Sequence, residues 1–227
     1  MVLREYLSIR RAYNLVRQDV ESARRLSFAE FAILCRLSVM GQSLRTSDIA
    51  EYQGSLRPTM THRTKHLGAL GLLAREKGGV DRRNVICSIT DEGRKYVDDL
   101  CDACREAIPN GQSLSRTSGA RVCRYVDAMG SLTCMAGDLT LLGLYSAKGQ
   151  PVSISRLVEI LGLLQPTVSM SVAALVEEGL VRREEDEEGE TGRTSPVLLT
   201  DEGRNRATAL NGQIERLIVH RRPRKSK

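Results

Sequence analysis

The sequence predicts a mainly α-helical protein with small β wings, an α+β fold built from two similar halves. The first observation is an internal repeat: Ile-Thr-Asp-Glu-Gly-Arg at 89–94 returns at 199–204 with Leu in the first position. The second is the helical spacing of apolar residues at the start and end of each half. The third is a pair of short β-rich runs, at 85–89 and 197–199. A repeat of this length is domain-sized, which indicates a tandem duplication and not a solenoid.

The halves are expected at residues 1–110 and 111–219, with a basic tail at 220–227. Pro58-Thr59 returns at 166–167 and Gly71-Leu72 at 179–180, so the two halves align closely. The turn-rich sequence Pro-Asn-Gly at 109–111 marks the junction. The tail either adds salt-sensitive affinity for nucleic acid or serves solubility.

Each half is expected to open and close with a helix that carries a narrow apolar seam. The opening seams step by three and four residues, from Tyr6 to Ala23 in the first half and from Val122 to Ala136 in the second. The closing seams contain Val97, Cys101, Cys104 and Ile108 in the first half, and Ala207, Leu210, Ile214 and Leu217 in the second. Such seams require other helices as partners.

Between these helices, each half is expected to contain a second helix, a short third helix and a longer fourth helix. The second helix lies at about 28–40, with a counterpart at 139–147. Thr46 or Ser47 is expected to cap the short helix, and Gly54 to end it. Pro58 and Pro166 fit the first turn of the fourth helices, because the amide that proline lacks has no helical partner there.

A short hairpin follows the fourth helix, which is expected to end near Gly71. Thr90 and Thr200 are expected to cap the closing helices, because the Asp-Glu pair after each is favoured by the helix dipole. A short helix, a glycine turn, a longer helix and a hairpin with a charged tip form a winged helix-turn-helix. In such a unit the longer helix enters the major groove of DNA, and Arg on the wing enters the minor groove.

Three segments of the first half resemble the MarR (multiple antibiotic resistance regulator) family: Arg-Pro-Thr-Met-Thr at 57–61, Leu-Gly-Leu-Leu-Ala-Arg at 70–75 and Asp-Arg-Arg-Asn-Val at 81–85. The family's wing pattern, Asp-x-Arg followed by Leu-Thr-x-x-Gly, is present with Ile89 in the Leu position. The second half is similar at 165–169, 179–183 and 199–203, although Thr191 replaces the Asp of the wing. The resemblance covers nearly the whole chain, twice.

The resemblance implies a transcription regulator of the bacterial or archaeal cytosol and nucleoid, often a repressor that a small ligand or thiol oxidation releases. Family members are homodimers of one winged-helix unit, whose first and last helices form the interface. Because this chain contains two units, the resemblance implies a single-chain pseudo-dimer that binds double-stranded DNA. The alternative is that only the first unit binds DNA and that the second is a protein-interaction or dimerisation module.

The resemblance places the DNA-binding residues on the longer helix and the wing of each half. They are Arg57, Thr59, Thr61, His62, Arg63 and Lys65 on the helix and Arg82 and Arg83 on the wing of the first half, and Gln165, Thr167, Ser169 and Arg193 in the second. Arg57 is expected to pair with guanine and Lys65 to contact phosphate. The alternative for any single residue is solvated surface.

The two halves differ in charge. Residues 1–110 carry 18 Lys+Arg against 14 Asp+Glu, whereas residues 111–219 carry 11 against 14, so the net charge of +6 conceals an asymmetry. The wing of the second half contains six acidic residues at 184–190, which DNA phosphates would repel. We therefore predict an asymmetric operator with half-sites about one helical turn apart. The alternative is that this loop bends away from DNA.

The six cysteines do not form a disulfide framework, which indicates a cytoplasmic protein with reduced thiols. Cys101 and Cys104 lie on an apolar helix face, so core packing is expected, and a redox switch is the alternative. No metal or cofactor is expected, because a lone Cys pair lacks the second half of a zinc site. His62 and His66 lie one turn apart, but on the helix expected to face DNA.

Several classes of protein are not expected. No catalytic triad, phosphate-binding glycine loop or pair of acids in a cleft is recognisable, so enzyme activity is not expected. No apolar stretch approaches the roughly 18 residues that span a bilayer, and no signal peptide is expected. A small-molecule effector is an open alternative; the side chains that would line its cleft, or simply pack, are Tyr6, Tyr13, Arg17 and Phe28.

Overall fold

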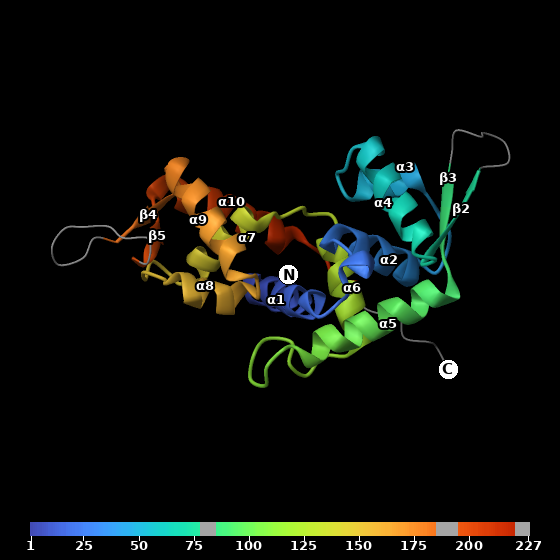
Figure 1. Cartoon of the computed structure of the whole chain (residues 1–227), viewed down its shortest axis with the longest axis horizontal. Coiled ribbons are helices and arrows are strands. Elements are labelled where there is room, and N and C mark those ends of the chain that lie inside the picture. The colour runs from blue at the N-terminus through green and yellow to red at the C-terminus, as the bar shows by residue number, and fades with distance from the viewer. Residues whose placement is uncertain (78–84, 185–194, 221–227) are drawn as a thin grey trace. The chain divides into compact units, whose positions relative to one another are not determined.

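The computed structural model describes residues 1–77, 85–184 and 195–220, which form helices and small antiparallel sheets (Figure 1). The chain divides into two compact units. Unit 1 contains Met1–Leu15 and Cys134–Arg216, and unit 2 contains Val16–Thr133 with the residues from Leu217 onward. These units do not coincide with the sequence halves, because the opening segment of each half lies in the unit formed by the other.

Unit 2 contains most of the first half, in the order of a winged helix. Its elements are η1 (Ser22–Arg24), α2 (Phe28–Met40), β1 (Leu44–Arg45), α3 (Thr46–Tyr52), α4 (Arg57–Ala69), β2 (Leu73–Lys77), β3 (Val85–Ile89), α5 (Asp91–Glu106) and α6 (Gly119–Met129). The strands form an antiparallel sheet in the order β1-β3-β2, with Leu73 opposite Ile89. The helix expected at 28–40, the strand at 85–89 and the proline in the first turn of α4 are confirmed.

Unit 1 follows the same order with residues of the second half, after α1 (Leu3–Gln18). Its further elements are α7 (Ala136–Ser146), α8 (Ile154–Leu161), α9 (Gln165–Glu177), β4 (Val181–Arg183), β5 (Val197–Leu199) and α10 (Asp201–Arg216). Strands β4 and β5 pair antiparallel, and Val152 bridges to Val197. Helix α7 begins earlier than the expected residue 139, because Asp138 Oδ2 accepts a hydrogen bond (3.0 Å) from the Met135 amide and so caps the first turn.

The opening helices are shorter than their apolar seams predicted. Helix α1 stops before Ala23, which lies in a 3-10 turn, and α6 stops before Ala136, which begins α7. The longer helices expected there were wrong because apolar residues beyond the helix ends keep the helical spacing, although Ala23 is exposed and Val20 and Leu132 are only half-buried. A stepped apolar pattern can therefore continue past the end of a helix.

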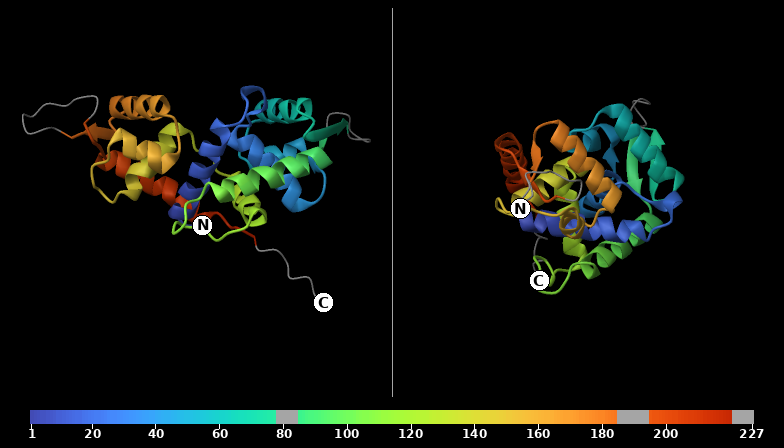
Figure 2. Two further views of the ribbon diagram at one scale, coloured as in Figure 1. Left: turned by 60° about the horizontal axis from the view of Figure 1, so that its bottom comes forward. Right: turned by 60° about the vertical axis from the view of Figure 1, so that its left-hand side comes forward.

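Helix α6 packs against α2 and α5 of unit 2 (Figures 1 and 2). Glycines at both of its ends permit this close approach. A Cβ at Gly119 would collide with Asp102 of α5, and a Cβ at Gly130 would lie 2.9 Å from Ala32 Cβ of α2. The apolar face of α6 thus finds its helical partners in the other half of the sequence.

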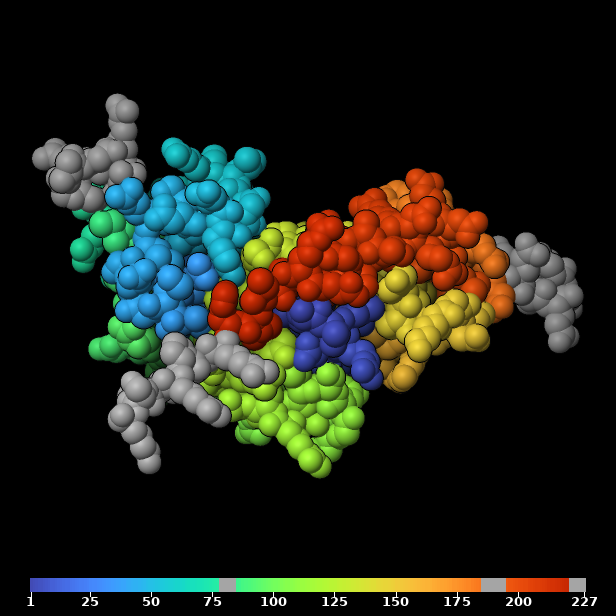
Figure 3. All heavy atoms as spheres, turned by 180° about the vertical axis from the view of Figure 1, so that it is seen from behind, coloured from blue at the N-terminus to red at the C-terminus, as the bar shows by residue number. Residues whose placement is uncertain are grey.

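Helix α1 is tied to unit 1 through three polar side chains. Arg11 Nε donates to the Glu159 carbonyl (2.7 Å), Asn14 Nδ2 to the Leu161 carbonyl (2.8 Å) and Arg10 Nη2 to the Cys134 carbonyl (3.3 Å). In Figure 3, α1 lies beside α10, whose Glu215 carbonyl is 3.4 Å from the amino group of Met1. These contacts place the opening helix of the first half in the unit formed by the second.

The repeated hexapeptide joins three elements of unit 2. The hydroxyl of Thr90 accepts a hydrogen bond from the Gly93 amide (2.9 Å), which caps α5 as expected, and donates to the Gly71 carbonyl (2.7 Å) after α4. The Thr90 amide donates to the Leu72 carbonyl (3.3 Å). In unit 1, the hydroxyl of Thr200 makes the same two bonds. The motif is therefore a clasp between the fourth helix, the hairpin and the closing helix.

The short helix α3 begins differently from the expectation. Its N-cap is Arg45, and no side chain caps it, so the cap assigned to Thr46 or Ser47 was wrong. The Thr46 hydroxyl instead donates to the Val85 carbonyl (3.0 Å) of β3, which ties the helix to the sheet. Gly54 follows α3 with a positive φ of 56°, as expected for a residue that ends a helix.

A buried acidic side chain connects α6 to α2 and α3. Asp127 Oδ2 lies 3.5 Å from Arg36 Nη1, and the Asp127 side chain is only 5% exposed. The Arg36 guanidinium stacks 3.9 Å from the centre of the Tyr52 ring, and the Tyr52 hydroxyl donates to the Asp127 carbonyl (3.0 Å). Asp127 Oδ1 is buried without a hydrogen-bond partner. Burial raises the pKa of Asp127 to about 6, although Arg36 opposes the shift.

No single helix in the described part of the chain is long and apolar enough to cross a membrane. Two helices bent by 115°, Ile154–Leu161 and Gln165–Glu177, together meet the length and composition of a membrane span, and nothing beyond length and composition indicates one.

The clasp predicts a steric requirement for glycine in both halves. A Cβ at Gly93 or Gly203 would collide with the carbonyl of Leu72 or Leu180. We expect Gly93→Ala and Gly203→Ala each to lower the free energy of unfolding by about 1–3 kcal/mol, measured by urea denaturation. Gly137→Ala on α7 is the control, because nothing lies within 4 Å of its added methyl group. Equal effects at the three positions would contradict the clasp.

The raised pKa of Asp127 predicts a pH-dependent stability. The native state holds this proton more tightly than the unfolded chain, so the stabilisation is complete below pH 3.8 and is lost as the pH rises through about 6. We expect Asp127→Asn to remove this decline, worth about 3 kcal/mol between about pH 4 and about pH 7 in denaturation experiments. The exposed Asp99→Asn is the control. Parallel stability curves for Asp127→Asn and the unsubstituted chain would rule out the shift.

Candidate nucleic-acid interface

Helix α4 presents one face to the interior of unit 2 and a polar face to solvent. Met60, Thr64 and Leu67 are buried and fix the helix on the core. On the opposite face Arg57, Thr59, His62 and Lys65 are exposed, and Thr61 is half-buried. The N-cap is Leu56, which makes no side-chain cap, and Pro58 occupies the first turn. The start of α4 therefore combines helical amide groups with exposed cationic side chains, an arrangement that attracts anions.

Arg63 differs from the other basic residues expected to meet DNA. Its Nη1 donates to Gln53 Oε1 (3.2 Å) and to Ser55 Oγ (3.2 Å), both in the turn between α3 and α4. Gln53 is itself buried and donates to the Ala29 carbonyl (3.0 Å) of α2. Arg63 thus holds the helix-turn-helix together in this structure, and its contact with DNA stays a prediction.

A second contact anchors α4 to α2. His66 Nδ1 lies 2.7 Å from Glu30 Oε1, and the Glu30 side chain is 8% exposed. Glu30 Oε2 accepts hydrogen bonds from the Ser27 amide and hydroxyl (both 2.7 Å), which completes a capping box at the start of α2. Burial raises the pKa of Glu30, but the hydrogen bonds from Ser27 and His66 outweigh it and hold the pKa below its usual value.

This anchor was not predicted. Ser27-x-x-Glu30 has the spacing of a capping box, so that part was visible in the sequence. The pairing of Glu30 with His66 was not visible, because the two residues lie on different helices. His66 therefore positions α4 and is not part of its exposed face.

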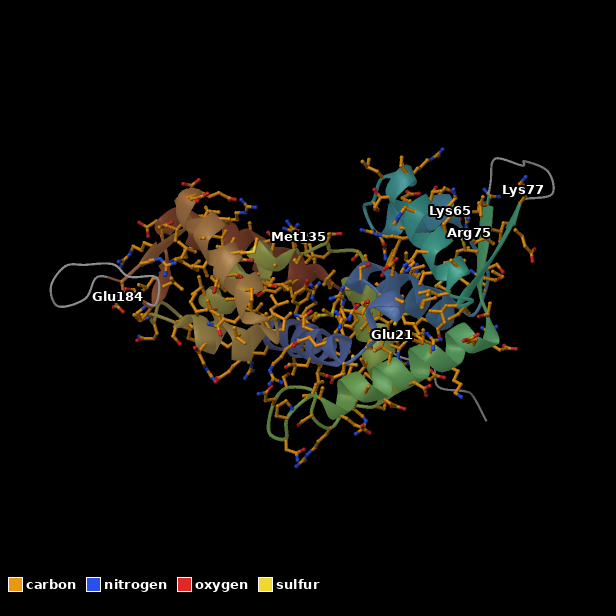
Figure 4. The ribbon with its side chains drawn as sticks, viewed as in Figure 1. Glu21, Lys65, Arg75, Lys77, Met135 and Glu184 are labelled. Carbon is orange, nitrogen blue, oxygen red and sulfur yellow. The ribbon has the colours of Figure 1, made fainter. Side chains whose placement is uncertain are left out.

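Strand β2 adds basic side chains that the sequence pattern did not indicate. Lys77 is exposed and Arg75 is half-buried on this strand, which packs against α4. A carbon of the Arg75 side chain lies 3.6 Å from the position that a Cβ at Gly68 would take on α4. Figure 4 labels both residues on the strand, together with Lys65 on α4. The wing residues Arg82 and Arg83 lie outside the described residues.

Helix α9 is the counterpart of α4 in unit 1, but its surface has a different character. Gln165 is exposed, and Thr167 and Ser169 are half-buried. Met170, at the position that corresponds to His62, is 74% exposed. The helix contains no Lys, Arg or His, so it offers DNA polar and apolar groups without positive charge. Arg193 and the acidic residues 185–190 lie outside the described residues.

Cys101 and Cys104 are both buried, with free thiols. Burial raises the pKa of Cys104 to about 12, so this thiol does not ionise near neutral pH. Of the side chains considered for an effector cleft, Tyr6 and Tyr13 are buried, and Arg17 Nε donates to the Leu26 carbonyl (2.8 Å). An effector cleft at these residues stays a prediction.

Comparison with known proteins connects part of the chain to a family. Residues 139–190 match the model of the MarR family. This segment begins in α7, contains α8, α9 and β4, and ends beyond the described part of the second wing. No curated protein matches the chain significantly. The sequence of α7 to β4 is therefore MarR-like.

Solved structures similar to the chain include regulators from bacteria and archaea. YusO from Bacillus subtilis is 24% identical over 45% of this chain and 67% of its own, with a TM-score of 0.36. The transcriptional regulator BldR from Sulfolobus solfataricus is 26% identical over 44% and 67%, with a TM-score of 0.37. Bordetella bronchiseptica BpsR, whose DNA binding is regulated by 6-hydroxynicotinic acid, is 23% identical over 44% and 74%, with a TM-score of 0.36.

Proposed function

We propose that the chain is a sequence-specific regulator of transcription that binds double-stranded DNA, with α4 in the major groove and the wing at the minor groove. The observation that carries the proposal is the exposed face of α4, on which Arg57, His62 and Lys65 project from a helix whose other face is buried. A helix presented in this way has the size and charge that the major groove accepts. The MarR-like sequence of residues 139–190 supports the class of regulator.

The exposed residues of α4 divide into two roles. Arg57 in the first turn has the donor geometry to read guanine through two hydrogen bonds, and Thr59 and Thr61 can meet a thymine methyl group or a phosphate. Lys65, two turns further along, together with Arg75 and Lys77 of β2, supplies phosphate contacts that set affinity without reading sequence.

The two fourth helices then cannot read the same sequence. Arg57, His62 and Lys65 of α4 correspond in the repeat to Gln165, Met170 and Ala173 of α9. As a single-chain pseudo-dimer, the chain would bind an operator with two unlike half-sites, of which α9 reads one by polar contacts from Gln165, Thr167 and Ser169. Repression is the sign of regulation that the resemblance implies.

One observation favours a second candidate. Leu164 at the start of α9 is 56% exposed and Met170 is 74% exposed, and the helix has no basic residue. Such a surface suits a protein partner better than a phosphate backbone. In this version only unit 2 binds DNA, and unit 1 is an interaction or dimerisation module.

Substitutions on α4 test the proposal. A duplex selected from a random pool by the full chain serves as the probe, and affinity is measured across a series of salt concentrations. We expect Lys65→Ala to weaken binding to all duplexes and to reduce the slope of log affinity against log salt by about 1. Arg57→Ala is expected to cost about 1–3 kcal/mol and to relax the preference at one base pair.

Lys95→Ala is the matched control, because Lys95 is an exposed lysine on α5. It removes the same charge away from the proposed interface and should leave the salt slope unchanged. Failure to select any duplex, or equal losses for Lys65→Ala and Lys95→Ala, would rule out α4 as the DNA-binding element.

A further inference from the structure

Three thiols meet in the interior of unit 2, each from a different helix. Cys35 lies on α2, Cys101 on α5 and Cys123 on α6. Their Sγ atoms all lie within 4.8 Å of one another, and the three residues are 0%, 1% and 6% exposed. The helix packing described above brings them together, since α6 contacts both α2 and α5.

The cluster does not follow the Cys-x-x-Cys spacing of the sequence. Cys104, one turn after Cys101, is not among the thiols that lie within this distance of each other. Cys123 Sγ lies 3.9 Å from the Cys35 carbonyl oxygen, so α2 and α6 approach closely at this point. Core packing alone explains a single buried cysteine as a small apolar side chain, but not why three sulfur atoms converge.

We propose that Cys35, Cys101 and Cys123 form a binding site for a thiophilic metal ion, and that the ion is Cu(I). Thiolate sulfur is a soft ligand that selects Cu(I) and zinc over harder cations. An ion centred among sulfurs at most 4.8 Å apart would lie at most about 2.8 Å from each, so small side-chain movements bring all three to a metal–sulfur distance of about 2.3 Å.

The number of ligands decides between the two soft ions. Structural zinc sites almost always have four protein ligands in a tetrahedron. Among the residues that the structure describes, the cluster contains three Cys and no fourth Cys, His, Asp or Glu atom within the same distance. Three thiolates in an apolar interior, without a fourth protein ligand, suit Cu(I) better than zinc.

Metal binding replaces the thiol protons of the cluster. The protons of Cys35, Cys101 and Cys123 leave to solvent as the three sulfurs coordinate the ion. No electron is exchanged in this step.

Binding at this cluster would cross-link α6 to α2 and α5. It would fix the opening helix of the second half onto the unit that carries α4. The proposal does not depend on DNA binding, because it rests on sulfur geometry within unit 2 alone.

Titration of the full chain with Cu(I), kept under reducing, oxygen-free conditions in competition with a chromophoric Cu(I) chelator, tests the proposal. We expect one Cu(I) per chain. Cys35→Ala, Cys101→Ala and Cys123→Ala should each weaken binding by more than about a hundredfold, because even residues that only support metal ligands contribute about 10- to 100-fold. Cys104→Ala is the matched control, since Cys104 is a buried cysteine on the same helix as Cys101, and it should bind as the unsubstituted chain does.

X-ray absorption of the unsubstituted, Cu(I)-loaded chain does not depend on whether the variants fold. We expect a first shell of three sulfurs and no nitrogen or oxygen. A shell with nitrogen or oxygen ligands, binding that survives loss of any one of the three cysteines in a folded variant, or no binding stronger than that of the chelator would each overturn the site.

Discussion

The packing of α6 on α2 and α5 is the contact on which unit 2 depends. The apolar face of α6 buries Val122, Tyr125, Val126 and Met129, and full burial of one such side chain contributes about 1.5–3 kcal/mol. The same helix places Asp127 beside Arg36 and Cys123 beside the thiols of Cys35 and Cys101. Helix α2 in turn anchors α4 through Glu30 and His66. The orientation of the exposed basic face of α4 therefore depends on α6, a helix that belongs to the second half of the sequence.

The two sequence repeats share residues that cap and begin helices and differ in residues that face outward. The clasp made by Thr90 and Thr200 is the same in both, as are the prolines in the first turns of α4 and α9. Lys65 of α4, by contrast, corresponds to Ala173 of α9. Two helices that read unlike DNA sequences would require this combination, in which the framework residues are the same and the exposed side chains differ.

Much of the fold could be predicted because its signals are local. The threonine caps of α5 and α10, the first-turn prolines and the glycine after α3 each act within a few residues of their own position. The lengths of α1 and α6 could not, because apolar residues after the helix ends, such as Val20 and Leu132, keep the spacing of a helix. The sequence also could not predict which unit each opening helix joins. An apolar seam shows that the helix needs a partner but does not identify that partner.

The candidate site also combines features that could be predicted from the sequence with features that could not. Exposure of Arg57, Thr59, His62 and Lys65 follows from helical period alone. The use of Arg63 inside the turn, the pairing of His66 with Glu30 and the meeting of three cysteines all join residues far apart in the sequence or on different elements. The spacing of Cys101 and Cys104 pointed to a pair, whereas the thiols that lie together come from three helices.

The mass of the chain bound to DNA tests the central proposal most directly. The face of α6 is already buried against α2 and α5, so we expect a single chain to supply both winged helices to one operator. Native mass spectrometry of the full chain with a selected duplex should show one chain per duplex, with protection of two major-groove segments about one helical turn apart. Two chains per duplex, each protecting one identical half-site, would contradict the single-chain pseudo-dimer.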